Sequence, residues 1–331
     1  MEMIKIIESA GLSIQDLGRE GYQKYGVPVG GVMDRYSAII TNYLVGNEKN
    51  APLLEFFMGG LKIKFLRDSI FAVGANSEVK LNGEKIDAWT AHIGKEGDVL
   101  EISQPKSGVY GYLSFQGGLK CQKVFGSCST YPQAGWGRYL KKGDVIEFKH
   151  SINRFPKRRE LPEELIPKYD RNPKIRLILG PQLEHFGKEG IRTFLSNEYI
   201  VTEESSRMGY RLDGPRIEHS EMGADIISDA IPLGSIQVPK SGKPIIMLAD
   251  HQTTGGYAKI GVVISADIPK VAQTPIGGKI RFQEISVEKA QMIWKRTCNT
   301  LQNIKRYLEG KIRAFRVKVN DESLLAFVEE I

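Results

Sequence analysis

The sequence is poor in the residues that build metal centres and disulfide frameworks. It has 3 cysteines and 5 histidines among 331 residues. No two cysteines form a Cys-x-x-Cys pair and three thiols cannot all pair within one chain, so we expect reduced thiols in a reducing compartment. Cys128 has no histidine close by in sequence, which favours a small packed thiol over a nucleophile. The histidines lack metal-ligand spacing, and no metal site is predicted. They are His92, His150, His185, His219 and His251.

Several standard nucleotide and catalytic motifs are also missing. There is no Gly-x-x-x-x-Gly-Lys-Ser/Thr loop, no Gly-x-Gly-x-x-Gly after a strand and no Gly-x-Ser-x-Gly elbow. These absences argue against an autonomous P-loop ATPase, a Rossmann cofactor site and an α/β-hydrolase. A Met-Lys-Met biotinylation site is absent as well. We therefore expect no covalent biotin on this chain, and any biotin would come from another protein.

No apolar run approaches the roughly 18 residues that a membrane-spanning helix needs, and the first residues lack the apolar core of a signal peptide. We expect a cytoplasmic protein that does not bind membranes. The net charge is +7, but its lysines and arginines are spread along the chain. The densest run, Lys157-Arg158-Arg159, lies among prolines, and no aromatic residues alternate with it, so a solvated basic linker is favoured over nucleic-acid binding.

Short β-branched runs between glycine and Asx turns predict a mainly β fold with some α structure. A helix is expected over 35–45, where Ile39, Ile40 and Leu44 follow helical spacing. A second helix is expected from Ser286 to Gly310, followed by a strand near Phe315 and a helix over 322–331. The strands are expected at 61–65, 70–73, 109–115, 145–148, 175–179 and 260–265.

The chain is long enough for two domains. Four prolines and many charges over 149–174 indicate a linker. We divide the chain into an N-terminal β-rich domain (1–150), a linker (151–174), a second β domain (175–285) and a C-terminal extension (286–331). The extension is expected to serve packing or assembly, or to form a contact surface for another protein of the same complex.

The most informative segment is Leu248–Gly261, which reads LADHQTTGGYAKIG. An apolar run is followed by a group of polar residues, then by two glycines and a second apolar run. This order is typical of a polar loop that two strands hold in place as a binding or catalytic site. An ordinary glycine turn between strands would look the same. A second segment of this kind, QDLGREGY, begins at Gln15 and continues to the Gly30-Gly31-Val32-Met33-Asp34-Arg35 stretch.

The polar residues of these segments suit an anionic or amide-bearing substrate. Arginine and lysine can bind carboxylate or phosphate oxygens, aspartates can accept protons or orient arginines, and glycine amides can hold an oxyanion. Asp16 with Arg19, or Asp34 with Arg35, could instead be structural ion pairs. His251 could be an acid–base group or a hydrogen-bonded residue at the rim. The catalytic candidates are Asp16, Arg19, Asp34, Asp250, His251, Gln252, Thr253 and Lys259. The binding candidates are Arg35, Ser127, Ser129, Thr130, Arg207, Thr254, Gly255 and Gly256.

With RMGYRLDGP from Arg207 and GSCSTY from Gly126, these motifs resemble one family from about Ile7 to Phe282. The chain resembles the C subunit of bacterial and archaeal 5-oxoprolinase, also called the KipA or allophanate hydrolase subunit 2 family, which is related to the carboxyltransferase part of urea amidolyase. The resemblance implies two cyclophilin-like β-barrel-type domains. It also implies ATP-dependent opening of 5-oxoproline to glutamate, through phosphorylation of the lactam carbonyl oxygen, with ATP and Mg at the assembled complex.

The resemblance further implies two partners, the KipI-like B subunit and the A subunit of 5-oxoprolinase, and a cleft shared by the Arg19/Asp34 and Gln252–Lys259 loops. Two other functions stay open: a KipA-type regulator that binds a KipI-like kinase inhibitor, and a component of a biotin-dependent carboxyltransferase. The chain departs from many relatives at His251, where they have arginine, and at Ala258, where they have proline. Its loop over 133–138 is also shorter, which affects the substrate assignment if that loop covers the site.

Overall fold

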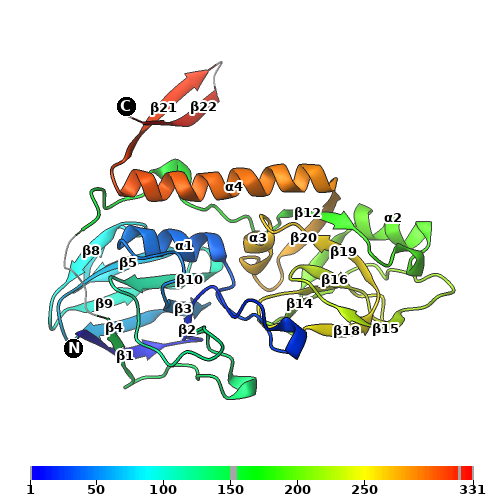
Figure 1. Cartoon of the computed structure of the whole chain (residues 1–331), viewed down its shortest axis with the longest axis horizontal. Helices are drawn as coiled ribbons and strands as arrows, with labels where there is room; N and C mark the ends of the chain where they lie inside the picture. The colour runs from blue at the N-terminus through cyan, green and yellow to red at the C-terminus, as the bar shows by residue number, and fades with distance from the viewer. Residues whose placement is uncertain (1, 150–154, 320–321, 330–331) are drawn as a thin grey trace.

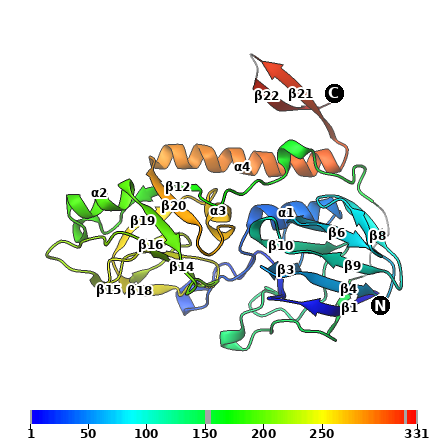
Figure 2. The ribbon, with the colours of Figure 1, turned by 180° about the vertical axis from the view of Figure 1, so that it is seen from behind.

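The computed structural model describes residues 2–149, 155–319 and 322–329 and is mainly β. Two β-rich halves lie side by side, and one long helix, α4 (Val287–Leu308), runs along both (Figure 1). Seen from behind, the same helix lies over α1 (Arg35–Leu44) of the first half and ends above the second half (Figure 2). Within the described ranges no helix is long and apolar enough to cross a membrane.

The first half contains two antiparallel sheets that pack over a shared core. In β4, Leu61, Ile63 and Phe65 are buried while Lys62 and Lys64 face outward, so one apolar face is available for packing. The core lies between the sheets and includes Ile6, Phe56 and Phe115. The six-stranded sheet has the order β11 (Val145–Phe148), β1 (Glu2–Ser9), β4 (Leu61–Phe65), β9 (Val99–Ile102), β6 (Val79–Leu81), β7 (Glu84–Ile86). The five-stranded sheet has the order β2 (Ser13–Gln15), β3 (Leu53–Phe57), β10 (Ser107–Phe115), β5 (Ser69–Asn76), β8 (Ala91–Gly94).

The second half is a closed seven-stranded barrel with a two-stranded ribbon beside it. Among the described strands this is the one closed barrel, so the first half differs from the predicted barrel type in being two separate sheets. The barrel order is β12 (Lys174–Leu179), β19 (Lys259–Val263), β16 (Ser235–Gln237), β17 (Ile245–Met247), β14 (Gly209–Asp213), β13 (Glu198–Val201), β20 (Lys279–Glu284). The ribbon is β15 (Asp225–Ala230) with β18 (Thr254–Tyr257), and the helices are α2 (Lys188–Ser196) and α3 (Ile268–Ala272). The short 3-10 helices of the chain are η1 (Gln23–Tyr25), η2 (Pro132–Ala134), η3 (Glu163–Leu165) and η4 (Leu183–His185).

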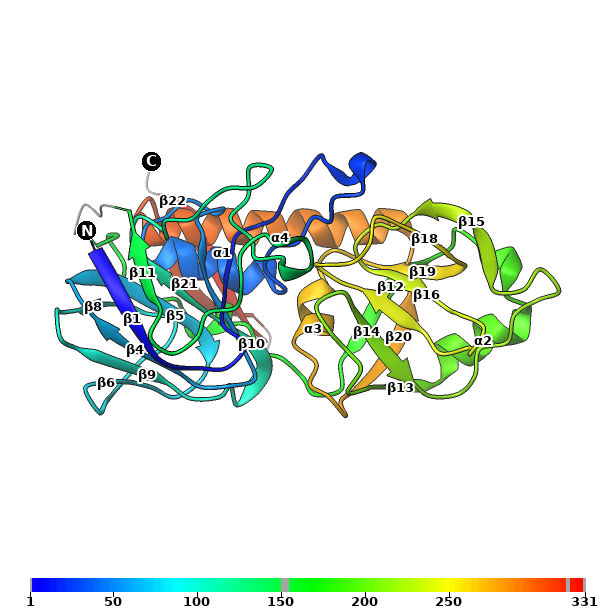
Figure 3. The ribbon, with the colours of Figure 1, turned by 90° about the horizontal axis from the view of Figure 1, so that it is seen from below.

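The two halves share one hydrophobic core at their junction. Met33, Tyr110 and Tyr112 from the first half belong to the same buried cluster as Leu248 and Ile260 from the second. Figure 3 shows the halves meeting along this junction, with the loops of the first half reaching toward the barrel. A continuous apolar core fixes the relative position of the halves, so polar groups placed at the junction are held in a set geometry.

Helices α1 and α4 begin and end close to where the sequence predicts. The side chain of Asp34 accepts the Ser37 N–H at the start of α1, and Ser286 accepts the Lys289 N–H at the start of α4. Gly310, with φ of 70°, follows the end of α4 in the left-handed conformation that glycine adopts without strain.

The end of the chain differs from the prediction. β21 (Ile312–Val319) confirms the strand near Phe315, but Glu322–Glu329 forms strand β22 and pairs with β21, so the predicted helix over 322–331 is wrong for these residues. Residues 320–321 and 330–331 lie outside the described ranges. Leu324–Val328 is a continuous apolar run, which fits a helix or a strand, and the cross-strand partner decides its conformation. Val287 and Trp294 follow the helical spacing of the apolar residues of α4, yet both are exposed, at 46% and 45%.

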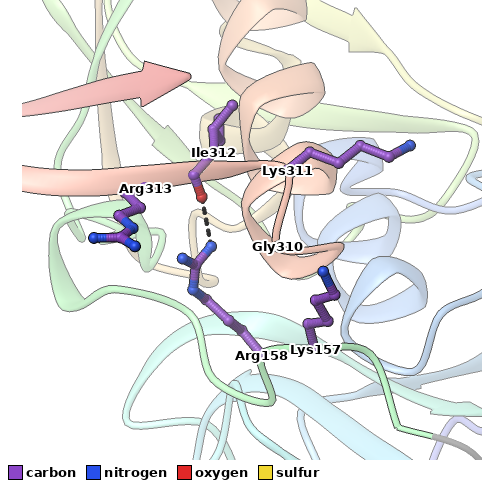
Figure 4. Close-up of a pocket in the computed structure, with 6 residues that line it drawn as sticks. All are labelled: Lys157, Arg158, Gly310, Lys311, Ile312 and Arg313. Carbon is purple, nitrogen blue, oxygen red and sulfur yellow. Dashed lines mark hydrogen bonds between the residues drawn. The ribbon is translucent and has the colours of Figure 1, made fainter. Parts of the chain in front are cut away.

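The basic segment around Arg158 is not simply solvated. Arg158 Nη1 donates to the carbonyl oxygens of Tyr307 and Ile312, both at 2.6 Å, and its guanidinium lies over the Tyr307 ring. These carbonyls lie at and just beyond the C-terminal end of α4, where a positive charge is favourable. Figure 4 shows Lys157 and Arg158 pointing toward this end, beside a cavity of about 280 Å³. The end of α4 therefore accounts for Arg158.

Candidate functional site

Asp16 is the centre of a buried polar network in the first half. Its Oδ1 accepts hydrogen bonds from the hydroxyls of Ser127 and Ser129, both at 2.6 Å, and from the Gly18 N–H at 2.8 Å. Its Oδ2 accepts the Cys128 N–H at 2.7 Å. Four donors around one carboxylate hold the loop at 127–129 against the loop at 16–19, and they leave Asp16 poorly placed to bind a metal. Thr130 continues this contact through its N–H to the Ile14 carbonyl.

Arg19 lies directly against this network and is 1% exposed. Its Nε donates to the Val124 carbonyl at 3.2 Å, and its Nη2 donates to the Ser129 carbonyl. The guanidinium carbon lies 4.8 Å from the centre of the Trp136 ring, which covers it. Burial lowers the pKa of Arg19, and the negative charges of Asp16 and Asp250 oppose that shift. Arg19 forms no direct ion pair with Asp16, so the two are not the simple turn pair that the sequence left open.

Arg207 joins the two halves through charge. From the barrel side it donates Nε to Asp250 Oδ2 at 2.8 Å and Nη2 to Asp250 Oδ1 at 3.1 Å. Its Nη1 donates to Glu55 of β3, and its Nη2 also reaches the Gly31 carbonyl. Burial opposes the charged guanidinium, but Glu55 and Asp250 outweigh it and raise the pKa of Arg207. Gly31 and Gly30 bring the Asp16–Arg19 segment to this ion pair, so both segments singled out in the sequence meet at the junction.

Asp34 has a structural position. Besides starting α1, its Oδ2 accepts the Gln273 amide at 2.9 Å and the Tyr169 hydroxyl. Arg35 does not pair with Asp34: it donates to the Leu17 carbonyl at 2.7 Å and pairs with Glu20. These bonds connect α1 to the segment before the barrel and to the loop that carries Arg19. These bonds support the loops around the site, but Asp34 and Arg35 do not contact Arg207 or Asp250 directly.

The rest of the Asp250 segment turns away from the junction. Gln252 and Thr254 are exposed, and Thr253 accepts the Ile231 N–H through its carbonyl. Thr254, Gly255 and Gly256 lie in β18, which pairs with β15. Lys259 is 1% exposed and donates to Asp229 at 2.8 Å and to the Ala230 carbonyl at 3.1 Å, which ties the ribbon to the barrel. The structure thus brings Asp250 to Arg19 and Arg207 and places Gln252–Lys259 on the neighbouring ribbon.

His251 follows Asp250 and is buried. Its Nδ1 has no hydrogen-bond partner within the described part of the chain. Burial lowers the pKa of the imidazole below its ordinary value of 6.5. The side chain is therefore neutral near pH 7, the form that can accept a proton or a hydrogen bond.

This burial predicts a pH effect on stability. Below pH 6.5 the unfolded chain takes up a proton at His251 before the folded chain does, so the free energy of unfolding falls as the pH drops below that value. We expect the His251→Gln protein to lose less stability than the unmodified protein between pH 7 and pH 5. Urea unfolding at a series of pH values measures this, and two parallel curves would contradict it.

An apolar cavity of about 250 Å³ is lined by Arg207 and by residues of both halves. Glu55, Arg207 and Tyr110 provide its polar wall, and Phe57 and Ile276 are among its apolar residues. Glu55 is fully buried and burial raises its pKa, although Arg207 and the Met33 N–H act in the opposite direction. A cavity of this size beside a charged group can hold a small molecule.

Sequence reasoning missed four residues of this site. Glu55 and Tyr112 lie inside apolar strands, where Tyr112 donates to Glu55 at 2.9 Å and accepts the Asp34 N–H at 2.8 Å. An acidic residue in the run LLEFF was the available signal, because a buried carboxylate needs partners. Tyr131 and Trp136 form a bridge in the loop that covers Arg19.

The expectation of unpaired thiols is wrong for two cysteines. Cys121 and Cys128 form a disulfide across a separation of 7 residues, and Cys298 is free. The turn between Val124 and Ser127 brings their Cα atoms to 5.7 Å, which the linear spacing did not reveal. The bond closes the loop whose Val124 carbonyl and Cys128 N–H bind Arg19 and Asp16.

Residues 25–284 match the family described as carboxyltransferase domain, subdomain A and B. The K. lactis urea amidolyase crystal structure superimposes with a TM-score of 0.85 and 29% identity, covering 92% of this chain and 20% of that one. The fold is thus that of a carboxyltransferase-type domain.

Two curated relatives define the family more narrowly. The 5-oxoprolinase C subunit of Haemophilus influenzae is 35% identical over 315 residues, covering 93% of this chain and all of the relative. The Escherichia coli protein of the same name is 35% identical over 296 residues, covering 87% and 93%. The chain belongs to the family of 5-oxoprolinase C subunits.

Proposed function

We propose that this chain is the C subunit of an ATP-dependent 5-oxoprolinase, which opens the 5-oxoproline lactam to glutamate. Full-length similarity to two 5-oxoprolinase C subunits supports this assignment. The observation in the structure that carries it is the buried junction of Arg19, Arg207 and Asp250, where donors and acceptors are fixed by a shared core. Fixed polar groups in a water-poor site are what activation of an unreactive amide requires.

The junction residues have separable tasks in this proposal. Arg19 and Asp250 face the substrate, while Asp16, Ser127 and Ser129 hold the Arg19 loop in place. Arg207 holds Asp250 through two hydrogen bonds and is itself held by Glu55 of the sheet, so the carboxylate cannot rotate away. His251 adds a neutral imidazole beside Asp250. Positioning of this kind is worth several orders of magnitude in rate, because it removes reorganisation from the reaction step.

ATP with Mg supplies the activating phosphoryl group in this proposal, and it belongs to the assembled complex. The described residues contain no cluster of three or more metal-binding side chains, and the oxygens of Asp16 are occupied by protein donors. The proposed partners are the KipI-like B subunit together with the A subunit, and a cytoplasmic location follows from the need for ATP. We keep the division at 1–150, 151–174, 175–285 and 286–331, and a cyclophilin-like type for the closed barrel of the second half, as part of the proposal.

Two observations favour the carboxyltransferase alternative. They are the family description and the likeness to urea amidolyase. The sequence has no biotinylation motif, so that activity would need a separate biotin carrier.

Omitting one protein at a time separates the proposals. We expect glutamate release from 5-oxoproline with ATP when this chain is mixed with its cognate A and B subunits, and none when this chain is left out. An inactive assembly that is folded and complete would overturn the assignment.

A further inference from the structure

One cationic donor at the junction lacks a partner. Arg19 Nη1 is buried and makes no hydrogen bond within the described residues, although Nε and Nη2 of the same guanidinium each have a carbonyl acceptor. An unpaired buried donor is costly, and the cost is higher when the donor carries charge. Such an atom indicates an acceptor that the protein itself does not provide.

A glycine lies directly beside this donor. A Cβ placed on Gly30 would lie 3.0 Å from Arg19 Nη1 and 3.6 Å from Asp250 Oδ1. Gly30 has a φ of 65°, and its N–H is held by the Ala249 carbonyl at 2.9 Å, so its position is fixed between the two segments. A strong donor and a carboxylate acceptor therefore lie around the position that a side chain on Gly30 would occupy. Asp250 Oδ1 accepts a single bond, from Arg207, and retains a second lone pair.

We propose that Arg19 Nη1 and Asp250 Oδ1 bind a cis amide group of the substrate in the space beside Gly30. In a lactam the carbonyl oxygen and the N–H lie on the same side, so the oxygen can accept from Arg19 while the N–H donates to Asp250. This inference rests on the proposed function in taking the 5-oxoproline lactam as the source of that amide. A ureido group has the same donor–acceptor arrangement and is the second source of the same chemistry.

The charges of the junction favour a neutral amide over the substrate's carboxylate. Two arginines, Arg19 and Arg207, face three carboxylates, Asp16, Glu55 and Asp250. The site has no surplus positive charge with which to offset the desolvation of another anion. It has instead one unused cationic donor, Arg19 Nη1. This donor stabilises the amide oxygen more strongly as negative charge develops on that oxygen during activation.

Trp136 controls access to this space. Its ring covers the Arg19 guanidinium at 4.8 Å, it is only partly buried, and Gly135 and Gly137 on either side have φ values of 73° and 76°. The ring must move for a substrate to reach Arg19, so its fluorescence reports binding directly. Trp89 and Trp294, the other two tryptophans, lie outside the junction.

A pair of glycine substitutions tests the proposal. Gly30→Ala places a methyl group in the amide space, whereas Gly26→Ala, on the same loop with a φ of 77°, meets nothing within 4 Å. Both carry the strain of alanine in the left-handed region, so they differ mainly in whether the space is filled. The probes for the full-length chain, alone and in the assembly, are 5-oxoproline, N-methyl-5-oxoproline, proline and 2-imidazolidinone.

We expect 5-oxoproline to bind the unmodified and Gly26→Ala proteins alike and the Gly30→Ala protein at least 10-fold more weakly (an order-of-magnitude expectation for one lost bidentate contact). N-methyl-5-oxoproline lacks the N–H and should bind poorly, and so should proline, which has the carboxylate but no lactam. Equal binding of 5-oxoproline to both glycine variants, or equal binding of proline and 5-oxoproline, would overturn the proposal and leave the space to a water molecule or an anion.

The two proposals can fail separately. An active three-part assembly whose KM for 5-oxoproline is unchanged by Gly30→Ala would remove the amide site and leave the proposed function standing. An inactive assembly whose chain binds 2-imidazolidinone in a Gly30-dependent manner would remove the 5-oxoprolinase assignment and support a ureido-binding site.

Discussion

Replacing Arg207 with methionine is expected to lower the free energy of unfolding by about 3–5 kcal/mol, the usual cost of leaving buried charges unpaired. Arg207 is the counter-charge of both Glu55 and Asp250, whose side chains are 2% and 4% exposed. Methionine fills a similar volume but leaves two carboxylates facing each other across the junction. Urea unfolding monitored by circular dichroism measures the change.

Two further variants make this expectation specific. Arg281→Met removes an arginine whose side chain is 68% exposed and pairs with Glu198, so its effect should be much smaller. Adding Glu55→Gln to Arg207→Met removes one of the stranded charges and should restore part of the lost stability. An Arg207→Met protein as stable as Arg281→Met would show that the junction ion pairs do not hold the halves together.

Replacing Asp16 with asparagine is expected to lower glutamate release by the assembly about 100-fold, the order of loss that a displacement of about 1 Å can cause. Two serine hydroxyls and two backbone N–H groups donate to this carboxylate, and an asparagine NH₂ would face some of those donors. The loop at 127–129 would shift, and with it the Ser129 carbonyl that holds Arg19.

Asp267→Asn is the matched control. Asp267 is also fully buried and is bonded by Arg176 and Lys270, but it lies in the barrel outside the junction network. Both substitutions should reduce stability, and only Asp16→Asn should reduce activity per folded molecule. If the two variants lose activity in proportion to their loss of stability, Asp16 supports the fold and not the site.

The sequence was sufficient where local pattern decides structure. Short β-branched runs over Leu61–Phe65 and Val145–Phe148 predicted β4 and β11, helical spacing of apolar residues predicted α1, and the cap residue Ser286 predicted the start of α4. The pattern failed over Glu322–Glu329, where pairing with β21 overrides a weak local preference. It also could not distinguish a closed barrel from two packed sheets, because both are built from the same short alternating strands.

The residues of the candidate site were also predicted only in part. Glycine and polar clustering pointed to Asp16, Arg19 and Asp250, which the structure places around Gly30 and Gly31. Glu55 was not found because its strand reads as core, and its role depends on Arg207, which lies 152 residues away. Lys259 was grouped with Asp250 by proximity in sequence, although the β18–β19 turn directs it to Asp229. Long-range pairing of charges is set by topology, and a linear pattern does not contain it.

The central claim is that the junction network of this chain acts on 5-oxoproline within a three-part enzyme. Glutamate release by the assembly containing Arg19→Ala, with the mass of the complex measured by light scattering on the same sample, tests it most directly. The account predicts a complex of unchanged mass with activity reduced to near background. A complex of unchanged mass and undiminished activity would contradict it.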